Sequence, residues 1–344
     1  MEKIKAAIIG LGRIASILED DALREKPCTH AGAIAANEDC VLAAGCDNDE
    51  KRRISFRERW KVPIFYDAAI MLQEIKPQIL SIATHPDSHY QYCHLAAEMK
   101  VPVIICEKPL ADNLSDAQKI ADLTKSNGGP VIITNHERRY SNDYRYVKAI
   151  LEEGSLGDII SVRMVLYFGK KRKLIDMLWD DGTHLIDVIM FLTDSTLIHK
   201  QKWGADIDGR TGTVWLEGEL HHTQNELKQK PQTASHKSPV PVIAEIGAGR
   251  DYLVFEIEFS CESGRLRIGN GVFEVWQSAP SPYAENFYSL LNTGDSLSGP
   301  TGYFANMLKD AVACVKDPKR VPVSGAIDGL KVIEYFDNVR NKNL

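Results

Sequence analysis

Two segments of the chain carry side chains suited to moving a proton at a hydroxyl group. Lys108 lies in Glu107-Lys108-Pro109, directly after the apolar run Val101–Cys106. Asp180 and His184 lie further along, four residues apart, at the start of an apolar stretch. On a helix this spacing puts both side chains on one side of a turn. A neutral imidazole can act as a general base, so the second segment is a candidate for proton transfer.

His184 is predicted to stay uncharged if it lies near a helix N-terminus. The positive end of the helix dipole and a nearby lysine both disfavour imidazolium. The alternative for this segment is structural. Asp180 or Asp181 would cap the helix, and His184 and Asp187 would form local hydrogen bonds.

Two loops are predicted to meet at the carboxyl edge of a parallel sheet. Lys108 follows one apolar strand, and Thr84-His85-Pro86-Asp87-Ser88-His89 ends the strand before it. Open α/β sheets bind ligands at this edge. Both loops should therefore line the same crevice.

A glycine turn near the start of the chain is typical of dinucleotide binding. Gly10-Leu11-Gly12-Arg13-Ile14-Ala15 fits G-x-G-x-x-A and follows the apolar run Ile4–Ile9. The first glycine permits a tight turn, the second lets the backbone approach a pyrophosphate, and Ala15 permits close packing. A helix is expected next, with its N-terminus toward the phosphates. An ordinary strand-to-helix turn is the simpler interpretation, but the strand-first context favours a nucleotide site.

Asp47 is the candidate for the adenosine ribose, because it ends the second apolar run, Cys40–Cys46. It comes later than is usual for such an acid, which is explained if Glu19–Pro27 is an insertion. A carboxylate there accepts bonds from ribose hydroxyls and repels a 2′-phosphate, which favours NAD over NADP. Arg52 and Arg53 leave NADP as an alternative, and Asp47 could also serve as a turn residue or N-cap.

The elements needed to position these residues fall into two groups. Strands and helices alternate to about residue 134, which predicts a parallel sheet in a doubly wound α/β domain. Beyond it, a helix at Asn142–Glu153 precedes alternating runs typical of antiparallel strands. His221–Pro239 is predicted to be a loop, and the last two helices to be structural. We therefore expect a dinucleotide-binding domain at 1–134 and an α+β substrate-binding and oligomerisation domain with an open, largely antiparallel sheet at 135–344.

Composition narrows the class of protein. The 344 residues exceed what one domain usually holds, and hydrophobic (44%) and charged (26%) fractions are those of an ordinary globular chain. A net charge of −6 argues against nucleic acid and anionic membranes as partners. The seven cysteines form no Cys-x-x-Cys pair, so no metal is predicted. No apolar run approaches the roughly 20 residues of a membrane span, and we expect a cytoplasmic protein with reduced cysteines.

With these motifs in order, the sequence resembles the Gfo/Idh/MocA oxidoreductases, the relatives of glucose-fructose oxidoreductase and inositol dehydrogenase. The resemblance rests on Gly10–Ala15, Thr84–His89, Glu107-Lys108-Pro109, Arg139 with Tyr140, and Asp180-x-x-x-His184-x-x-Asp187. It implies that Lys108, Asp180 and His184 form the catalytic group, that the Lys108-Pro109 bond is cis, and that the second domain forms homodimers or homotetramers. The predicted cofactor-binding residues are Gly10, Gly12, Arg13, Ile14, Asp47, Thr84, His85, Pro86, His89, Glu107 and Lys108.

The implied reaction is reversible oxidation of a secondary hydroxyl on a sugar, cyclitol or nucleotide sugar. His184 would take the hydroxyl proton, Lys108 would stabilise the alkoxide and lower the histidine pKa, and Asp180 would orient the substrate or support proton transfer. The alternatives are a reductase similar to biliverdin reductase or dihydrodiol dehydrogenase, and a non-catalytic NAD sensor. A sensor has no need for a proton acceptor beside the dinucleotide turn.

The substrate pocket is where the sequence departs from its relatives. Leu174–Trp179 replaces the glycine-rich run that many of them carry before the aspartate. Lys170-Lys171-Arg172-Lys173 precedes it, and such a run is usually solvated surface. At a pocket rim it would instead bind an anionic group such as the diphosphate of a nucleotide sugar. The predicted substrate-binding residues are Arg139, Tyr167, Lys171 and Arg172.

Overall fold

The computed structural model describes residues 2–126, 128–169, 172–206, 208–222, 238–297 and 299–341. The chain divides into two compact units. The first contains Met1–Asn142 and Pro300–Glu334, and the second contains Asp143–Gly299 and Tyr335–Leu344. The domain boundary predicted at residue 134 assigns Pro300–Glu334 to the second domain. In the structure the chain returns to the first unit for these residues, which a single boundary does not describe.

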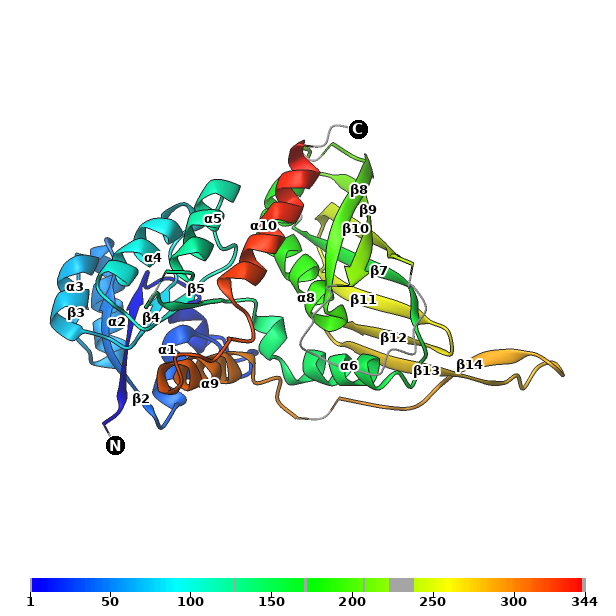
Figure 1. Cartoon of the computed structure of the whole chain (residues 1–344), viewed down its shortest axis with the longest axis horizontal. Helices are drawn as coiled ribbons and strands as arrows, with labels where there is room; N and C mark the ends of the chain where they lie inside the picture. Colours follow the sequence, from blue (N-terminus) through cyan, green and yellow to red (C-terminus); the bar gives the residue numbers. More distant parts are fainter. Residues whose placement is uncertain are drawn as a thin grey trace. The chain divides into compact units, whose positions relative to one another are not determined.

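The first unit is built on a parallel six-stranded sheet in the order β3-β2-β1-β4-β5-β6 (Figure 1). The order reverses between β1 and β4, whose neighbouring carboxyl ends form the ligand-binding position of doubly wound folds. This architecture confirms the predicted class. Its strands are β1 (Ile4–Ile9), β2 (Cys40–Cys46), β3 (Ile64–Phe65), β4 (Ile79–Ile82), β5 (Val103–Cys106) and β6 (Val131–Thr134).

Side-chain caps fix where several helices of this unit begin. Asp49, Asp67 and Asn113 each accept a hydrogen bond from a backbone N–H of the first helical turn, which satisfies a donor that has no partner inside the helix. The α-helices are α1 (His30–Ala36), α2 (Glu50–Trp60), α3 (Ala68–Ile75), α4 (His89–Glu98), α5 (Leu114–Leu123) and α9 (Tyr303–Lys316). The 3₁₀ helices are η1 (Ile17–Asp20), η2 (Pro86–Ser88) and η3 (Glu137–Tyr140).

The helix expected directly after the glycine turn is interrupted. The first turn forms, because Ser16 N donates to Gly12 O at 3.2 Å, but the chain then leaves the helix until α1 begins. His30 N donates to Ile14 O and Ala31 N to Ala15 O, so α1 hydrogen-bonds to the first turn. The helix expected after the glycine turn is therefore divided into a single turn and α1, and the excursion between them includes the segment predicted to be an insertion.

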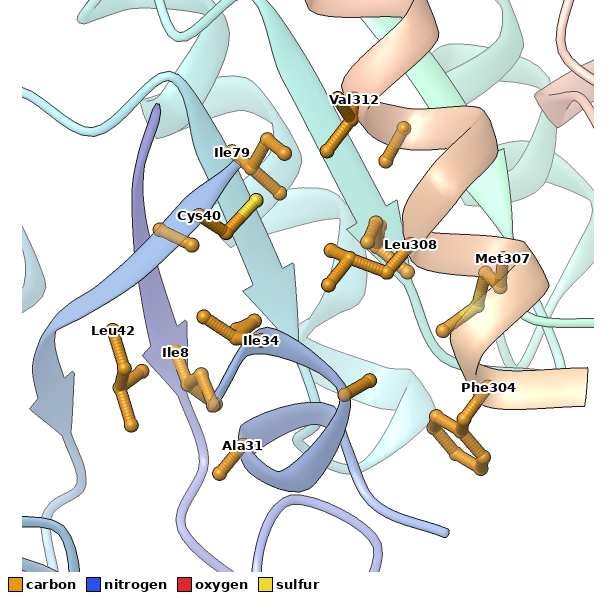
Figure 2. Packing of buried hydrophobic residues seen from close by; sticks show 14 of the residues in the cluster. Ile8, Ala31, Ile34, Cys40, Leu42, Ile79, Phe304, Met307, Leu308 and Val312 are labelled. Carbon is orange, nitrogen blue, oxygen red and sulfur yellow. The ribbon is translucent and has the colours of Figure 1, made fainter. Parts of the chain in front are cut away.

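The core of the first unit explains why the chain returns to it. Buried side chains of α9, including Leu308 and Val312, share one hydrophobic cluster with Ile34 of α1 and Ile79 of β4 (Figure 2). Burying these apolar groups stabilises the unit and fixes α1 and α9 together. The loops at the ends of the strands are therefore attached to a well-packed core.

The second unit contains an eight-stranded sheet in the order β14-β13-β12-β11-β7-β10-β9-β8. Only the described pairing of β7 with β10 is parallel, so the prediction of a largely antiparallel sheet is confirmed. Its strands are β7 (Ile159–Gly169), β8 (Ser195–Gly204), β9 (Gly212–His222), β10 (Val240–Arg250), β11 (Val254–Cys261), β12 (Gly264–Gly269), β13 (Val272–Pro280) and β14 (Tyr288–Asn292).

One face of this sheet is apolar and the other carries charged pairs. In β11, Phe255 and Ile257 are buried, whereas Glu256 and Glu258 between them are half-buried. Glu258 pairs with Arg265 of β12 at 2.8 Å, across the antiparallel register. Opposite charges facing each other in this way support strand pairing.

The helices of the second unit include an irregular one. They are α6 (Asn142–Glu153), α7 (Leu174–Met177), α8 (Thr183–Thr193) and the end of α10 (Ala326–Asn341). A π-helical segment, η4 (Leu178–Gly182), joins α7 to α8 without a break. Gly182 allows close packing here, because a Cβ would lie 3.2 Å from Phe336 Cζ.

Three further sequence predictions concern the chain as a whole. Residues 223–237 of the predicted loop at His221–Pro239 lie outside the described residues. The seven cysteines are buried and free, as expected. Across the described part of the chain, every helix is too short or too polar to span a bilayer.

Candidate functional site

The glycine turn lies at the reversal point of the first sheet. Gly10 has a φ of +85°, and a Cβ there would lie 2.6 Å from Ala83 O, at the end of β4. Only glycine fits both conditions. For Gly12, the nearest described atom beyond its chain neighbours is Arg52 Nη1, at 4.0 Å from the position of a Cβ. The second glycine therefore leaves space over the turn, whereas the first is needed to form it.

Asp47 lies beneath this turn. It is 6% exposed, and its carboxylate accepts hydrogen bonds from Leu11 N at 2.7 Å and Asp49 N at 2.8 Å. Arg52 Nη1 lies 3.7 Å from the same carboxylate. A carboxylate has about four acceptor positions, so two backbone bonds leave capacity for another donor. The interpretation of Asp47 as a turn residue is correct, and it leaves the ribose role available.

The Thr84–His89 loop is tied to the loop after β5 by a buried histidine. The ring of His89 has its Nε2 3.2 Å from Thr84 O and its Nδ1 3.1 Å from Pro109 O. Burial lowers the pKa of His89 and outweighs the opposing contribution of these carbonyls. His85 and Pro86 lie within this loop. It follows β4, so it lies at the same carboxyl edge of the parallel sheet as Gly10, which follows β1.

Glu107 is the centre of a buried polar network. Its Oε1 accepts hydrogen bonds from His30 Nε2 at 2.8 Å and Asn135 Nδ2 at 2.5 Å, and its Oε2 accepts one from Lys108 N at 3.2 Å. Burial alone would raise the pKa of Glu107. The bonds from His30 and Asn135 and the charge of Lys108 outweigh it, and the pKa stays below its ordinary value.

This network fixes the backbone that carries Lys108. The side chain of Lys108 is half-buried, and the peptide bond to Pro109 is cis, as predicted. His30 and Asn135 were not among the predicted site residues. His30 follows the excursion after the glycine turn, and Asn135 follows β6, so their convergence depends on the sheet order rather than on any motif.

The second candidate segment has a different geometry from the one predicted. Asp180 lies in η4 and His184 in the first turn of α8, but helical structure begins already at Leu174. His184 therefore lies inside a continuous helical stretch, and the argument that a free helix N-terminus keeps it neutral was wrong. A π-turn inside a helix is rare, and the π-turns that do occur are often found at functional sites.

The cationic run is only partly described. Lys170 and Lys171 lie outside the described residues, so the predicted role of Lys171 has no structural counterpart here. The guanidinium of Arg172 donates to Asp181 Oδ2 at 2.7 Å and to the carboxylate of Asp180. Arg172 is thus engaged with the acidic pair of η4.

The other two predicted substrate residues lie in separate units. Arg139, 6% exposed, pairs with Asp328 Oδ1 at 3.1 Å and donates to Val323 O, both in the first unit. Tyr167 of β7 donates to the carboxylate of Glu245, and burial raises its pKa to about 12, with the bonded carboxylate adding to the effect. Both side chains are held by protein groups.

Comparisons with known proteins agree with these motifs. Residues 4–135 match the family model described as an oxidoreductase family with an NAD-binding Rossmann fold. The D-apiose dehydrogenase of Rhizobium rhizogenes is 30% identical over 166 residues, which is 44% of this chain and 46% of that protein. An inositol 2-dehydrogenase of Gluconacetobacter diazotrophicus is 29% identical over 36% of this chain and 37% of that protein. The chain thus spans less than half the length of these two relatives.

Other matches cover nearly the whole chain at lower identity. The inositol 2-dehydrogenase of Salmonella typhimurium is 22% identical over 91% of this chain and 94% of that protein. Among solved structures, a dehydrogenase from Chromobacterium violaceum has a TM-score of 0.75 at 14% identity, over 99% of this chain and 95% of that one. The UDP-N-acetylglucosamine 3-dehydrogenase of Acidithiobacillus ferrooxidans has a TM-score of 0.72 at 15% identity, over 99% and 97%. These structures establish the fold.

The fold and the glycine turn define a dinucleotide-binding Rossmann architecture in the first unit, and the second unit is built on a separate sheet. The match of residues 4–135 to the Gfo/Idh/MocA family model supports the resemblance that the motifs indicated.

Proposed function

We propose that the protein is an NAD-linked dehydrogenase that oxidises a secondary hydroxyl group of a sugar or cyclitol ring. The observation that carries this proposal is the reversal point of the first sheet, where the Gly10 turn, the Thr84–His89 loop and the fixed Lys108 share one edge. The names of the relatives, which include apiose and inositol dehydrogenases, support a polyol or sugar substrate.

The residues at the glycine turn fit a dinucleotide. The space over Gly12 would receive the pyrophosphate, and the capacity left on the carboxylate of Asp47 would serve the ribose hydroxyls. Arg13 and Ile14 belong to the same turn, and Glu107 anchors the backbone of Lys108 at the same edge of the sheet. The nicotinamide, when bound, supplies the hydride acceptor.

The chain's own residues would handle the proton and the developing charge. In this proposal His184 accepts the hydroxyl proton, Lys108 stabilises the oxygen that loses it, and Asp180 orients the substrate hydroxyl. The hydrogen bond from Lys108 N to the buried carboxylate of Glu107 supports a fixed lysine backbone. Preorganised charge of this kind is worth most where water is excluded.

We propose NAD rather than NADP because Asp47 is the group nearest the expected ribose position. Its carboxylate repels a 2′-phosphate, whereas Arg52, 3.7 Å away, is half-exposed and attracts one. Calorimetric titration with each cofactor decides between them. We expect tighter binding of NAD, and Asp47→Asn should weaken it by roughly tenfold through the loss of a charged acceptor. Equal or tighter binding of NADP by the wild type contradicts this assignment.

A substrate screen tests the reaction. Free cyclitols, aldoses and nucleotide sugars are each incubated with the protein and either NAD or NADP, and the absorbance of reduced nicotinamide is followed. We expect turnover with at least one uncharged ring polyol. Cofactor binding without turnover on any member of the panel would instead favour a non-catalytic NAD sensor.

A further inference from the structure

The guanidinium of Arg172 is enclosed by acceptors from the π-turn. Nη1 donates to Asp181 Oδ2 at 2.7 Å, while Nη2 donates to the carboxylate of Asp180 and to Asp176 O at 3.2 Å. The guanidinium carbon lies 5.6 Å from the centre of the Phe168 ring. Arg172 therefore joins the end of β7 to the helical segment that carries Asp180 and His184.

The planar fork of arginine suits this arrangement. Each of its two terminal nitrogens binds one carboxylate, a geometry that a lysine ammonium does not reproduce. The Arg172 side chain is 29% exposed, and those of Asp180 and Asp181 are 57% and 30% exposed. The carboxylate of Asp180 is thus held on one side and remains reachable on another.

We propose that Arg172 is a positioning residue that fixes the carboxylate of Asp180 as a hydrogen-bond acceptor for a substrate hydroxyl. This inference rests on the proposed function and refines it. The guanidinium of Arg172 donates to the carboxylate of Asp180, so Asp180 acts as an acceptor that orients the hydroxyl, while the proton goes to His184.

The same geometry narrows the substrate class. A phosphate that bound Arg172 through the same N–H groups would compete with the carboxylates of Asp180 and Asp181, which already accept from both terminal nitrogens. An uncharged polyol ring leaves this arrangement intact. The expected diphosphate contact at Arg172 is therefore replaced by an internal one.

The alternative is an ion pair without effect on catalysis. Partly exposed pairs contribute only about 0–1 kcal/mol to stability, so a stability measurement does not separate the two cases. The coupling between Arg172 and Asp180 in the reaction does, because a positioning residue acts through its partner.

The experiment compares Arg172→Met, Arg172→Lys and the control Lys173→Met, with and without Asp180→Asn, on a polyol that the wild type oxidises. Lys173 is exposed and belongs to the same cationic run. We expect Arg172→Met to lower kcat/KM roughly 10- to 100-fold, as for the loss of a hydrogen bond to a charged group. Arg172→Lys should recover only part of this loss, and Lys173→Met should stay within about twofold of the wild type.

The Asp180→Asn background decides the mechanism. In that background, Arg172→Met should change kcat/KM by less than about threefold, because the carboxylate that Arg172 positions is already absent. An unchanged Arg172→Met enzyme, or the same loss in both backgrounds, overturns the inference while leaving the proposed function intact. A loss confined to KM for phosphate-bearing substrates shows instead that Arg172 binds the substrate anion. A wild type that oxidises no polyol overturns the proposed function, and this inference with it.

Discussion

The two units present their candidate catalytic groups in contrasting ways. In the first, Gly10, Thr84 and Lys108 come from three loops far apart in the sequence, and the parallel sheet brings the loops to one edge. In the second, Asp180 and His184 lie on one short helical stretch, and Arg172, which comes after β7 in the sequence, holds the aspartate.

This difference shows what fixes each set of groups. At the sheet edge, position follows from strand register and from buried hydrogen bonds such as those to Glu107. On the helical segment, position follows from a π-turn and partly exposed ion pairs, which are weaker restraints. Changes to the residues that build the sheet edge, such as Gly10 and Glu107, should therefore affect stability, whereas changes at the helical segment should affect catalysis alone.

The largest stability effect is expected from Gly10→Ala. The added Cβ would lie 2.6 Å from Ala83 O at a φ of +85°. A positive φ alone costs a non-glycine residue roughly 1–3 kcal/mol, and the clash adds to it. Thermal unfolding should show a drop of several degrees, together with loss of NAD binding by calorimetry.

Gly12→Ala is the matched control. Its Cβ meets open space, with Arg52 Nη1 at 4.0 Å, so the melting temperature should stay close to that of the wild type while NAD affinity falls. This outcome would separate the glycine that builds the turn from the one that leaves room for phosphates. Equal destabilisation by both variants contradicts the distinction.

A smaller effect is expected from the pH dependence of Glu107. Its pKa is lowered in the folded state, so its contribution to stability is complete above the unfolded value of about 4.3 and is lost as the pH falls through the folded value. Denaturant unfolding between about pH 3 and pH 6 should therefore show a shallower pH dependence for Glu107→Gln than for the wild type. The exposed Glu74→Gln is the control, and equal slopes for Glu107→Gln and the wild type would refute the network.

The sequence predicted the first unit better than the second for physical reasons. Apolar runs marked β1 and β2 with the bounds observed, because buried parallel strands are apolar throughout. The insertion at Glu19–Pro27 was predicted. The residues at which the helix breaks, between Ser16 and α1, were not. A charged stretch indicates that a buried helix is unfavourable there, but it does not indicate the residue at which the next helix begins.

Three other features of the structure had no distinct signal in the sequence. The π-turn at Leu178–Gly182 has no distinct residue pattern, so an ordinary helix start was expected at Asp180. The pairing of Arg172 with its acidic neighbours was likewise not predicted, because a run of four cations does not indicate which side chain forms an ion pair. The bonds from His30 and Asn135 to Glu107 join residues from three separate elements.

We propose that Lys108 and His184 serve one reaction, and a double-mutant cycle tests this proposal most directly. Turnover of an identified polyol is measured for Lys108→Ala, His184→Ala and the double variant, with NAD affinity measured for each. We expect each single variant to lose about 10²- to 10⁴-fold in kcat/KM with NAD binding largely intact. The double variant should lose little more than the worse single one, as for residues that act as a unit. Near-normal rates in both single variants, or losses that multiply in the double variant, would contradict the claim.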